Sequence, residues 1–313
     1  MTGDVAISAY AWAPDGRSIF FVAKRDPEAE FNSLYRISLA GGEAELLFTH
    51  VSGIGSIYPA PDGTTLAFTA TDAPPAKQSE LAEKGFMAVV HEESVPETHV
   101  WLLSLESLEA VRHDLPGSAH DLDWSSDGKR YAVGLAPSPL VDDSYTSQDI
   151  HIVDASTGEV ESRIGSVGKL GHFEFSPDGE RVAYVGSVDE HDPESGRLYL
   201  SSTTGGERRE LVPNYMGHIS DFTWIDDVEI RWLGGRGVYT EVYAANTGAT
   251  REVEETDGGG VIIGSMHAYP GQRLFAAVAD RGQVDVMEIN SGRLVATINV
   301  EGIPRVLSQY WRH

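Results

Sequence analysis

Short apolar segments and polar turns alternate along this chain with a regular period. In each period an apolar segment runs into a Pro-Asp-Gly turn, or a variant of it, and a second apolar segment follows at once. The aspartate position of the turn falls at Asp15, Asp62, Asp127, Asp178, Asp227 and Pro270. Proline presets the second position of a type I turn, and the glycine supplies the left-handed residue that closes a β-hairpin. The pattern predicts six hairpins and a positive φ at Gly16, Gly63, Gly128 and Gly179.

Each period continues through a third apolar segment, a glycine-centred turn and a fourth segment. The first period shows this order in residues 34–37, Gly41-Gly42 and residues 44–47. Four strands per period, repeated at spacings of 43 to 65 residues, predict an all-β fold: a six-bladed β-propeller with four-stranded antiparallel blades. A partial seventh blade that uses Ile303 to Trp311 stays open as an alternative. The strand that closes the ring would come from Val5–Ser8 or from Val300–Ile303.

One spacing is longer than the others and marks an insertion. Asp62 and Asp127 are 65 residues apart, and the excess falls between the second and third strands of that period. Two prolines stop the preceding strand, residues 76–84 are good helix formers ahead of Gly85, and residues 86–90 predict an added strand. We therefore expect residues 1–313 to form one propeller domain with an insertion at 72–98. The insertion is either a functional element of a rim or a tolerated surface excursion.

The amino-acid composition of the chain limits the classes of partner that it is expected to bind. The chain has 23 basic and 48 acidic residues, a net charge of −25, which repels nucleic acid and anionic membranes, so neither is an expected partner. A salt-adapted host and an ordinary acidic protein both explain this charge. Without cysteine there is no disulfide, zinc-thiolate site or thiol nucleophile. The apolar runs are too short to span a membrane and the start lacks a secretory signal, so a cytoplasmic location is expected.

Three histidines, His120, His172 and His218, come just ahead of the first strand of successive periods. In a propeller these positions lie around one rim of the central channel, where several imidazoles could converge on a divalent metal. Polar side chains are also expected there because the strands begin at the solvent. Spacing around a ring does not by itself bring ligands to one ion. We predict no catalytic residue, no cofactor and no metal, with these histidines as the candidates if a channel metal exists.

Some units resemble a known family. The run Phe175–Tyr184, the later Leu198–Leu200 and the interruption Glu80–Glu93 with His99–Leu103 after it are similar to propeller domains of prolyl oligopeptidase-type serine peptidases, in the acylaminoacyl-peptidase branch. The Pro-Asp-Gly repeats also resemble TolB, a relative of the WD40-like propellers. In that peptidase family a separate α/β-hydrolase domain carries the nucleophile in a Gly-x-Ser-x-Gly turn. No such pentapeptide occurs here, and the sequence ends at His313, right after the sixth unit.

The resemblance thus implies a propeller that gates substrate and has no catalytic half of its own. Its expected partner is a peptide or protein ligand at one rim, with a hydrolase domain or subunit as a further partner. Two alternatives stay open: a stand-alone TolB-like scaffold that binds a protein or peptide, and a channel-metal propeller lyase or lactonase.

Overall fold

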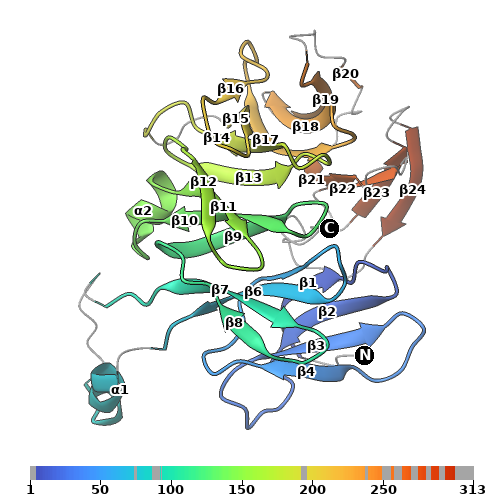
Figure 1. Ribbon diagram of the computed structural model, residues 1–313. Coiled ribbons are helices and arrows are strands. Elements are labelled where there is room, and N and C mark those ends of the chain that lie inside the picture. The colour runs from blue at the N-terminus through green and yellow to red at the C-terminus, as the bar shows by residue number, and fades with distance from the viewer. Residues whose placement is uncertain are drawn as a thin grey trace.

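The computed structural model describes residues 5–73, 76–86, 92, 94–191, 196–236, 239–248, 255–256, 263–268, 274–279, 283–288 and 293–299. Within these ranges the chain forms six four-stranded antiparallel sheets, each made of consecutive strands. The sheets stand around a central axis (Figure 1), and the first strand of each sheet contacts the first strand of the next, from β1 through β21. This arrangement confirms the predicted all-β propeller with four-stranded blades.

The strands of the first three blades are regular and short. Blade 1 contains β1 (Ile7–Trp12), β2 (Ser18–Ala23), β3 (Ser33–Ser38) and β4 (Glu45–Thr49). Blade 2 contains β5 (Ile57–Pro59), β6 (Thr65–Thr71), β7 (Thr98–Ser104) and β8 (Ala110–Arg112). Blade 3 contains β9 (Ser118–Trp124), β10 (Arg130–Ala136), β11 (Asp149–Asp154) and β12 (Val160–Ile164).

The other three blades repeat the same order. Blade 4 contains β13 (Leu170–Phe175), β14 (Arg181–Gly186), β15 (Arg197–Ser202) and β16 (Arg209–Glu210). Blade 5 contains β17 (His218–Trp224), β18 (Glu229–Arg236), β19 (Tyr239–Asn246) and β20 (Glu255–Thr256). Blade 6 contains β21 (Ile263–Ala268), β22 (Leu274–Ala279), β23 (Gln283–Glu288) and β24 (Arg293–Asn299).

The two ends of the chain bear on ring closure. Ile7 and Ser8, from one of the two predicted closing segments, belong to the innermost strand of blade 1, which pairs with β2. The other predicted closing segment, residues 300–303, and the predicted partial seventh blade at 303–311 lie outside the described residues. Where the structure describes them, blades 1 and 6 each contain four strands from one continuous stretch of chain.

The hairpin turns follow the predicted chemistry. Gly16, Gly63, Gly128 and Gly179 have φ values of 65°, 70°, 68° and 72°. The turn aspartate accepts a hydrogen bond from the backbone N–H two residues later, as Asp15 does from Arg17 at 2.9 Å. In the fifth repeat this acceptor is Asp226, not Asp227 as the alignment predicted, because Trp224 pairs with Ile230 and the turn is one residue shorter. The sixth turn, with Pro270, lies outside the described residues.

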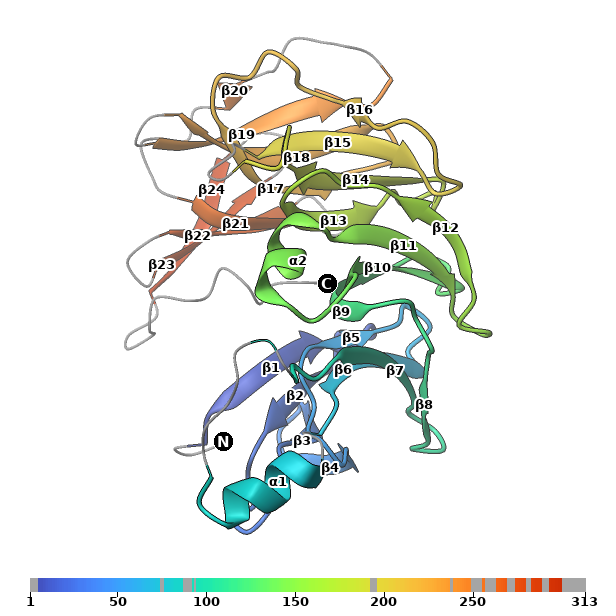
Figure 2. The same cartoon turned by 90° about the vertical axis from the view of Figure 1, so that its left-hand side faces the viewer.

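Because the strands form an antiparallel meander, each blade has two kinds of end. The hairpin rim carries the turns between first and second and between third and fourth strands: 13–17, 39–44, 60–64, 105–109, 125–129, 155–159, 176–180, 203–208 and 225–228. The loop rim carries the second-to-third-strand loops and the connectors between blades: 24–32, 50–56, 72–97, 113–117, 137–148, 165–169, 187–196 and 211–217. Both helices lie on the loop rim, on the opposite side from the β11–β12 turn (Figure 2).

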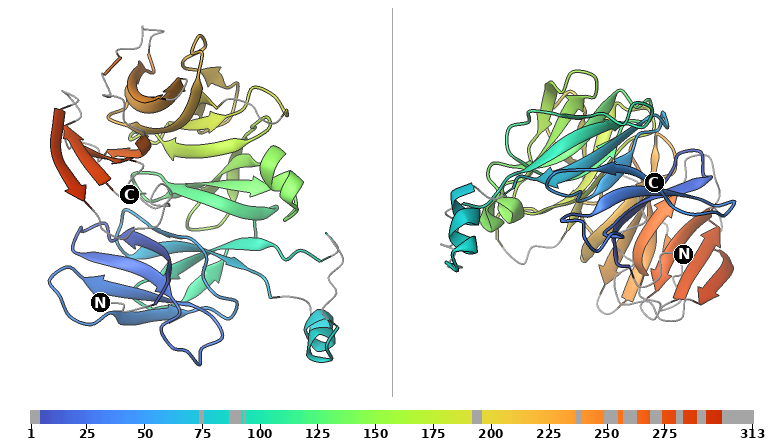
Figure 3. Two further views of the ribbon diagram at one scale, coloured as in Figure 1. Left: turned by 180° about the vertical axis from the view of Figure 1, so that it is seen from behind. Right: turned by 90° about the horizontal axis from the view of Figure 1, so that it is seen from below.

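The insertion belongs to the loop rim of blade 2. Helix α1 (Ala76–Glu83) occupies the predicted helical stretch, and the N–H of Phe86 donates to the Leu81 carbonyl at 2.9 Å across Gly85, whose φ is 85°. The added strand predicted for 86–90 falls almost entirely on residues outside the described part. The helix stands away from the ring when the molecule is seen from behind and from below (Figure 3). In the described part of the chain, no helix has the length and apolar character that a membrane crossing requires.

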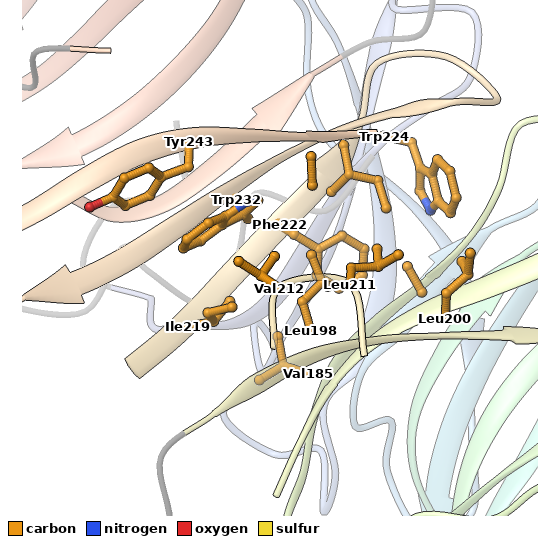
Figure 4. Packing of buried hydrophobic residues seen from close by; sticks show 13 residues of the cluster. Val185, Leu198, Leu200, Leu211, Val212, Ile219, Phe222, Trp224, Trp232 and Tyr243 are labelled. Carbon is orange, nitrogen blue, oxygen red and sulfur yellow. The ribbon is translucent and has the colours of Figure 1, made fainter. Parts of the chain in front are cut away.

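Hydrophobic cores lie between neighbouring blades. Leu198 and Val185 of blade 4 pack against Phe222 and Trp232 of blade 5 in one such layer (Figure 4). Equivalent layers join blades 1 and 2, 2 and 3, and 3 and 4. The repeat-position aromatics Trp124, Phe175 and Trp224 are buried in these layers, so they hold the blades together.

Candidate functional site

Arginines hold the hairpin rim together from blade to blade. The Arg181 guanidinium lies over the Trp224 ring of the next blade, 5.6 Å from its centroid, and Nη2 donates to the Asp227 carbonyl at 2.5 Å. Arg130 repeats the arrangement one blade earlier, over Phe175 and with a 2.7 Å bond to the Gly179 carbonyl. These guanidinium groups bind the turns of the neighbouring blade. Their hydrogen-bonding groups are therefore used within the ring and not offered to a ligand.

The loop rim differs because it leaves large apolar side chains in solvent. Among the residues whose exposure the structure describes, nine such side chains lie in its segments: Val51, Leu81, Phe86, Val95, Val141, Tyr145, Val167, Val188 and Met216. The hairpin rim has three, which are Leu39, Leu108 and Val228. Single exposed apolar residues are ordinary, but their concentration on one face indicates a binding surface.

Glycines in the connectors bring the loop rim close to the strands below it. A Cβ on Gly168 would lie 2.1 Å from the Asp189 carbonyl oxygen, and one on Gly117 would lie 2.2 Å from that of Ala136. Gly217 has the same relation to the Gly235 carbonyl at 2.3 Å. The sequence reading missed these glycines, although all three come ten residues before the aspartate position of their repeat. A side chain at these positions would displace the connectors of the loop rim.

The innermost strands of blades 3, 4 and 5 place carboxylates and one imidazole close together. Asp121 and Asp123 lie on β9, His172 and Glu174 on β13, and Asp221 on β17. His172 Nε2 lies 3.0 Å from Glu174 Oε1 and 3.9 Å from Asp221 Oδ1, and its ring contacts Phe222 with the centroids 4.9 Å apart. We call this group the acidic wall. All five side chains are half-buried.

Much of the acidic wall has a structural role. An innermost strand has no partner strand on its channel side, so its backbone N–H groups need other acceptors. Asp123 Oδ2 accepts from the Phe175 N–H of the next blade at 2.7 Å, and Glu174 Oε2 accepts from the Trp224 N–H at 3.4 Å. Asp121 accepts from the Tyr58 hydroxyl of the preceding blade at 3.0 Å. These carboxylates therefore connect neighbouring blades across the wall.

The three candidate histidines do not occupy equivalent positions. His120 lies four residues before Trp124, His172 three before Phe175, and His218 six before Trp224. Register shifts in these innermost strands, between Val133 and Leu135 on the blade 3 pair and between Ile219 and Asp221 on the blade 5 pair, change which residues face one another. Only His172 joins the acidic wall.

His218 and His120 have other surroundings. His218 Nδ1 accepts from the Gly196 N–H at 2.7 Å, and desolvation together with the Arg197 charge lowers the pKa of His218. His120 is exposed on β9, where partial desolvation lowers its pKa against the opposing charge of Asp121. In the described part of the chain no group of three or more histidine, aspartate or glutamate side chains is placed to hold a metal ion. The candidate histidines therefore do not fit a shared metal.

Comparison with known proteins gives a distant relative. No family model matches the chain. Over 141 residues it is 23% identical to dipeptidyl-peptidase 5 of Porphyromonas gingivalis, a stretch that covers 43% of this chain and 21% of that protein. The match thus spans about a fifth of the relative's length.

Solved structures share the fold. An oligogalacturonate lyase in complex with manganese has a TM-score of 0.68 at 15% identity, covering 93% of this chain and 77% of that one. The oligogalacturonate lyase of Vibrio parahaemolyticus gives 0.67 at 15% identity, covering 97% and 81%. TolB of Acinetobacter baumannii gives 0.50 at 17% identity, covering 82% and 55%. At these identities the likeness concerns the propeller and not its chemistry.

Proposed function

We propose that this chain is a non-catalytic propeller that gates or positions peptide substrate for an α/β-hydrolase domain of the prolyl oligopeptidase type. Three features support the proposal: the partial match to dipeptidyl-peptidase 5, the propeller fold, and the absence of a Gly-x-Ser-x-Gly pentapeptide from the 313 residues. The observation that carries it is the gathering of exposed apolar side chains on the loop rim.

The two rims would then have separate roles. The hairpin rim maintains the ring through bonds between blades, whereas the loop rim meets the partner. A gate of this kind acts by excluding large substrates and by holding small ones near the hydrolase, which lowers the entropic cost of reaction. No bond cleavage by the propeller is required.

Photo-crosslinking would test this assignment. A benzoylphenylalanine at Val188 on the loop rim and another at Val228 on the hairpin rim have nearly equal exposure, 47% and 48%, so they sample the two faces fairly. In extracts of the source cell we expect mass spectrometry to identify an α/β-hydrolase crosslinked through Val188 and not through Val228. Crosslinking through Val228 alone would refute the use of the loop rim.

Two further results would redirect the proposal. Hydrolysis of aminoacyl-nitroanilides by the purified chain would contradict a non-catalytic role. Identification of an unrelated protein at Val188, with no hydrolase, would support the stand-alone TolB-like scaffold instead. A metal-dependent lyase is not proposed, because the likeness to the lyases is one of fold and the described residues offer no metal ligand group.

A further inference from the structure

Five of the exposed apolar side chains come from consecutive segments over blades 3, 4 and 5. They are Val141 and Tyr145 of helix α2 (Val141–Thr146), Val167, Val188 and Met216. We call them the apolar arc. Met216 is 90% exposed, more than any other large apolar residue whose exposure is described. A methionine held in solvent is costly for solubility and is typical of a surface that adapts to a ligand.

Side-chain and backbone contacts join these segments along the loop rim. Lys169 Nζ lies 5.6 Å from the centroid of the Tyr145 ring, which places α2 beside the connector that contains Val167. The neighbouring Gly168 packs directly under Asp189, so this connector also meets the loop that contains Val188. Arg197 Nη1, at the far end of that loop, donates to the Gly217 carbonyl at 2.7 Å, next to Met216. These contacts place the four segments next to one another, in order from α2 to the start of β17.

Exposed carboxylates lie beside the apolar arc. Asp142, Asp189 and Glu190 are exposed beside its apolar members. The His191 backbone N–H donates to Asp189 at 2.8 Å and lowers the pKa of that carboxyl, so it stays ionised. The cations near the arc already have partners: Lys169 lies over the Tyr145 ring, Arg197 donates to the Gly217 carbonyl, and Arg208 donates to the Ser187 and Val188 carbonyls. The connectors continue into β13 and β17, which carry His172, Glu174 and Asp221 of the acidic wall.

We infer that the apolar arc binds an extended polypeptide segment that combines apolar side chains with lysine or arginine. Charge complementarity selects this occupant, because an acidic segment would meet Asp142, Asp189 and Glu190 at close range in a chain of net charge −25. Apolar side chains of the segment would cover Val141, Tyr145, Val188 and Met216, and its cations would face the carboxylates. The inference rests on the proposed peptide-binding function and names the peptide chemistry.

Labelled probe peptides can test the arc directly. Fluorescence anisotropy would compare four fluorescein-labelled ten-residue peptides that alternate leucine with lysine, leucine with glutamine, leucine with glutamate, and serine with lysine. We expect the leucine–lysine peptide to bind most tightly, and its affinity to fall as salt rises because the carboxylates contribute. The serine–lysine and leucine–glutamate peptides should each bind at least about tenfold more weakly, one lacking the apolar contacts and the other carrying the wrong charge.

A matched pair of variants locates the site. V141S/V188S removes two members of the arc, whereas V111S/V228S removes side chains of the same type and exposure elsewhere, 61% and 48% against 62% and 47%. We expect the arc variant to weaken leucine–lysine binding about tenfold and the control to bind as the unmodified chain does, with circular dichroism showing that both are folded.

The outcomes separate the inference from the proposed function. Equal binding of leucine–lysine and serine–lysine peptides, unchanged in V141S/V188S, would show diffuse attraction to an acidic protein and overturn the arc. Tight binding that only V111S/V228S removes would also overturn it, while a peptide-binding propeller would stand. Failure of all four peptides to bind would count against both. If the chain dimerises and V141S/V188S abolishes the dimer, the arc binds a second copy of the chain. This result would refute the inference that it binds a peptide segment.

Discussion

The two rims of this propeller are made from ends of the same strands, yet they differ in the length of their segments and in the number of large apolar side chains that they expose. Turns of the hairpin rim are short, capped by aspartates and tied to the next blade by Arg130 and Arg181. Segments of the loop rim are longer, contain both helices and expose most of the large apolar side chains. The difference teaches that repetition in sequence maintains the ring, whereas departures from repetition shape the loop rim, where we propose that a partner binds.

The loop rim itself consists of an exposed outer surface and a more constrained layer beneath it. Its outer surface exposes apolar side chains, but the layer beneath is constrained, because a Cβ on the connector glycines would meet backbone carbonyls. Substitutions should therefore separate the two layers of the loop rim as clearly as they separate the two rims.

The largest effect is expected from a pair of glycines with identical φ values of 65°. Gly168→Ala places a Cβ 2.1 Å from the Asp189 carbonyl oxygen, whereas Gly16→Ala meets nothing within 4 Å. Left-handed strain alone costs about 1–2 kcal/mol, and a backbone clash adds about 1–3 kcal/mol. Urea denaturation should thus show a loss of about 3–4 kcal/mol for Gly168→Ala and about half of that or less for Gly16→Ala. Equal losses would mean that the connector does not need the close contact.

The next effect concerns the bonds between blades on the hairpin rim. Arg181→Met removes the bonds to the Asp227 carbonyl and, at 3.0 Å, to the Thr247 hydroxyl, together with the contact over Trp224. Charged hydrogen bonds of this kind contribute about 1.5–3 kcal/mol, and partial exposure of the guanidinium favours the low end. Thermal unfolding should show a clear fall in Tm, while Arg17→Met, an exposed arginine of the same rim, should leave it unchanged. Similar Tm values for both variants would contradict the role of Arg181.

A pH effect tests a buried histidine at the contact between blades 2 and 3. His113 is buried with Nδ1 2.7 Å from the Tyr131 hydroxyl, and burial lowers its pKa although the Asp154 charge opposes this. Between that lowered pKa and the ordinary value of 6.5 the unfolded chain binds the proton and the folded chain does not. Stability from this group is therefore present above about pH 6.5 and is lost as the pH falls, by up to about 1.4 kcal/mol per pH unit.

Two variants isolate this contribution. Comparing Tm at pH 7.5 and 5.5, we expect His113→Gln to show a smaller acid-induced fall than the unmodified chain, and His191→Gln, whose side chain is 89% exposed, to show the same fall. A fall that both variants preserve in full would assign the pH dependence to other groups, such as buried His50, whose pKa burial also lowers.

The smallest effect is expected from removing the insertion. Thr71 pairs with Thr98, and the Asp72 N–H donates to the Glu97 carbonyl at 2.8 Å, so the strands are already joined where the insertion leaves them. Replacing residues 73–96 by Asn-Gly should change the free energy of unfolding by less than about 1 kcal/mol, since loop length carries little free energy and Leu81 and Phe86 are exposed. A calorimetric loss of several kcal/mol would show that the insertion supports the ring.

The hairpin rim was predictable from sequence because its causes are local. A proline, an aspartate and a glycine within five residues specify both the φ value and the acceptor, so Gly16 and Asp15 could be placed without knowing the rest of the fold. The error at Asp227 also has a local origin, since one deleted residue moved the acceptor to Asp226. Helix α1 was predictable for the same reason, from its composition and Gly85.

The loop rim and the acidic wall depend on contacts that the sequence does not show. Helix α2 was missed because its residues are poor helix formers. The three histidines were candidates for one site by their place in the repeat, but of the three only His172 lies beside carboxylates of two strands, Glu174 on β13 and Asp221 on β17. The carboxylates of Asp123 and Glu174 accept hydrogen bonds from backbone N–H groups of the next blade, and no local sequence pattern predicts such a role.

The order of the sheets has a consequence for how the molecule comes into being. Every described sheet contains four strands that follow one another in the chain, and none borrows a strand from elsewhere. Each blade can therefore assemble from its own contacts while later parts are still being synthesised, which keeps the sequence separation of contacting residues small for an all-β fold. Contacts between neighbouring blades, such as those between β13 and β17, can then form in chain order.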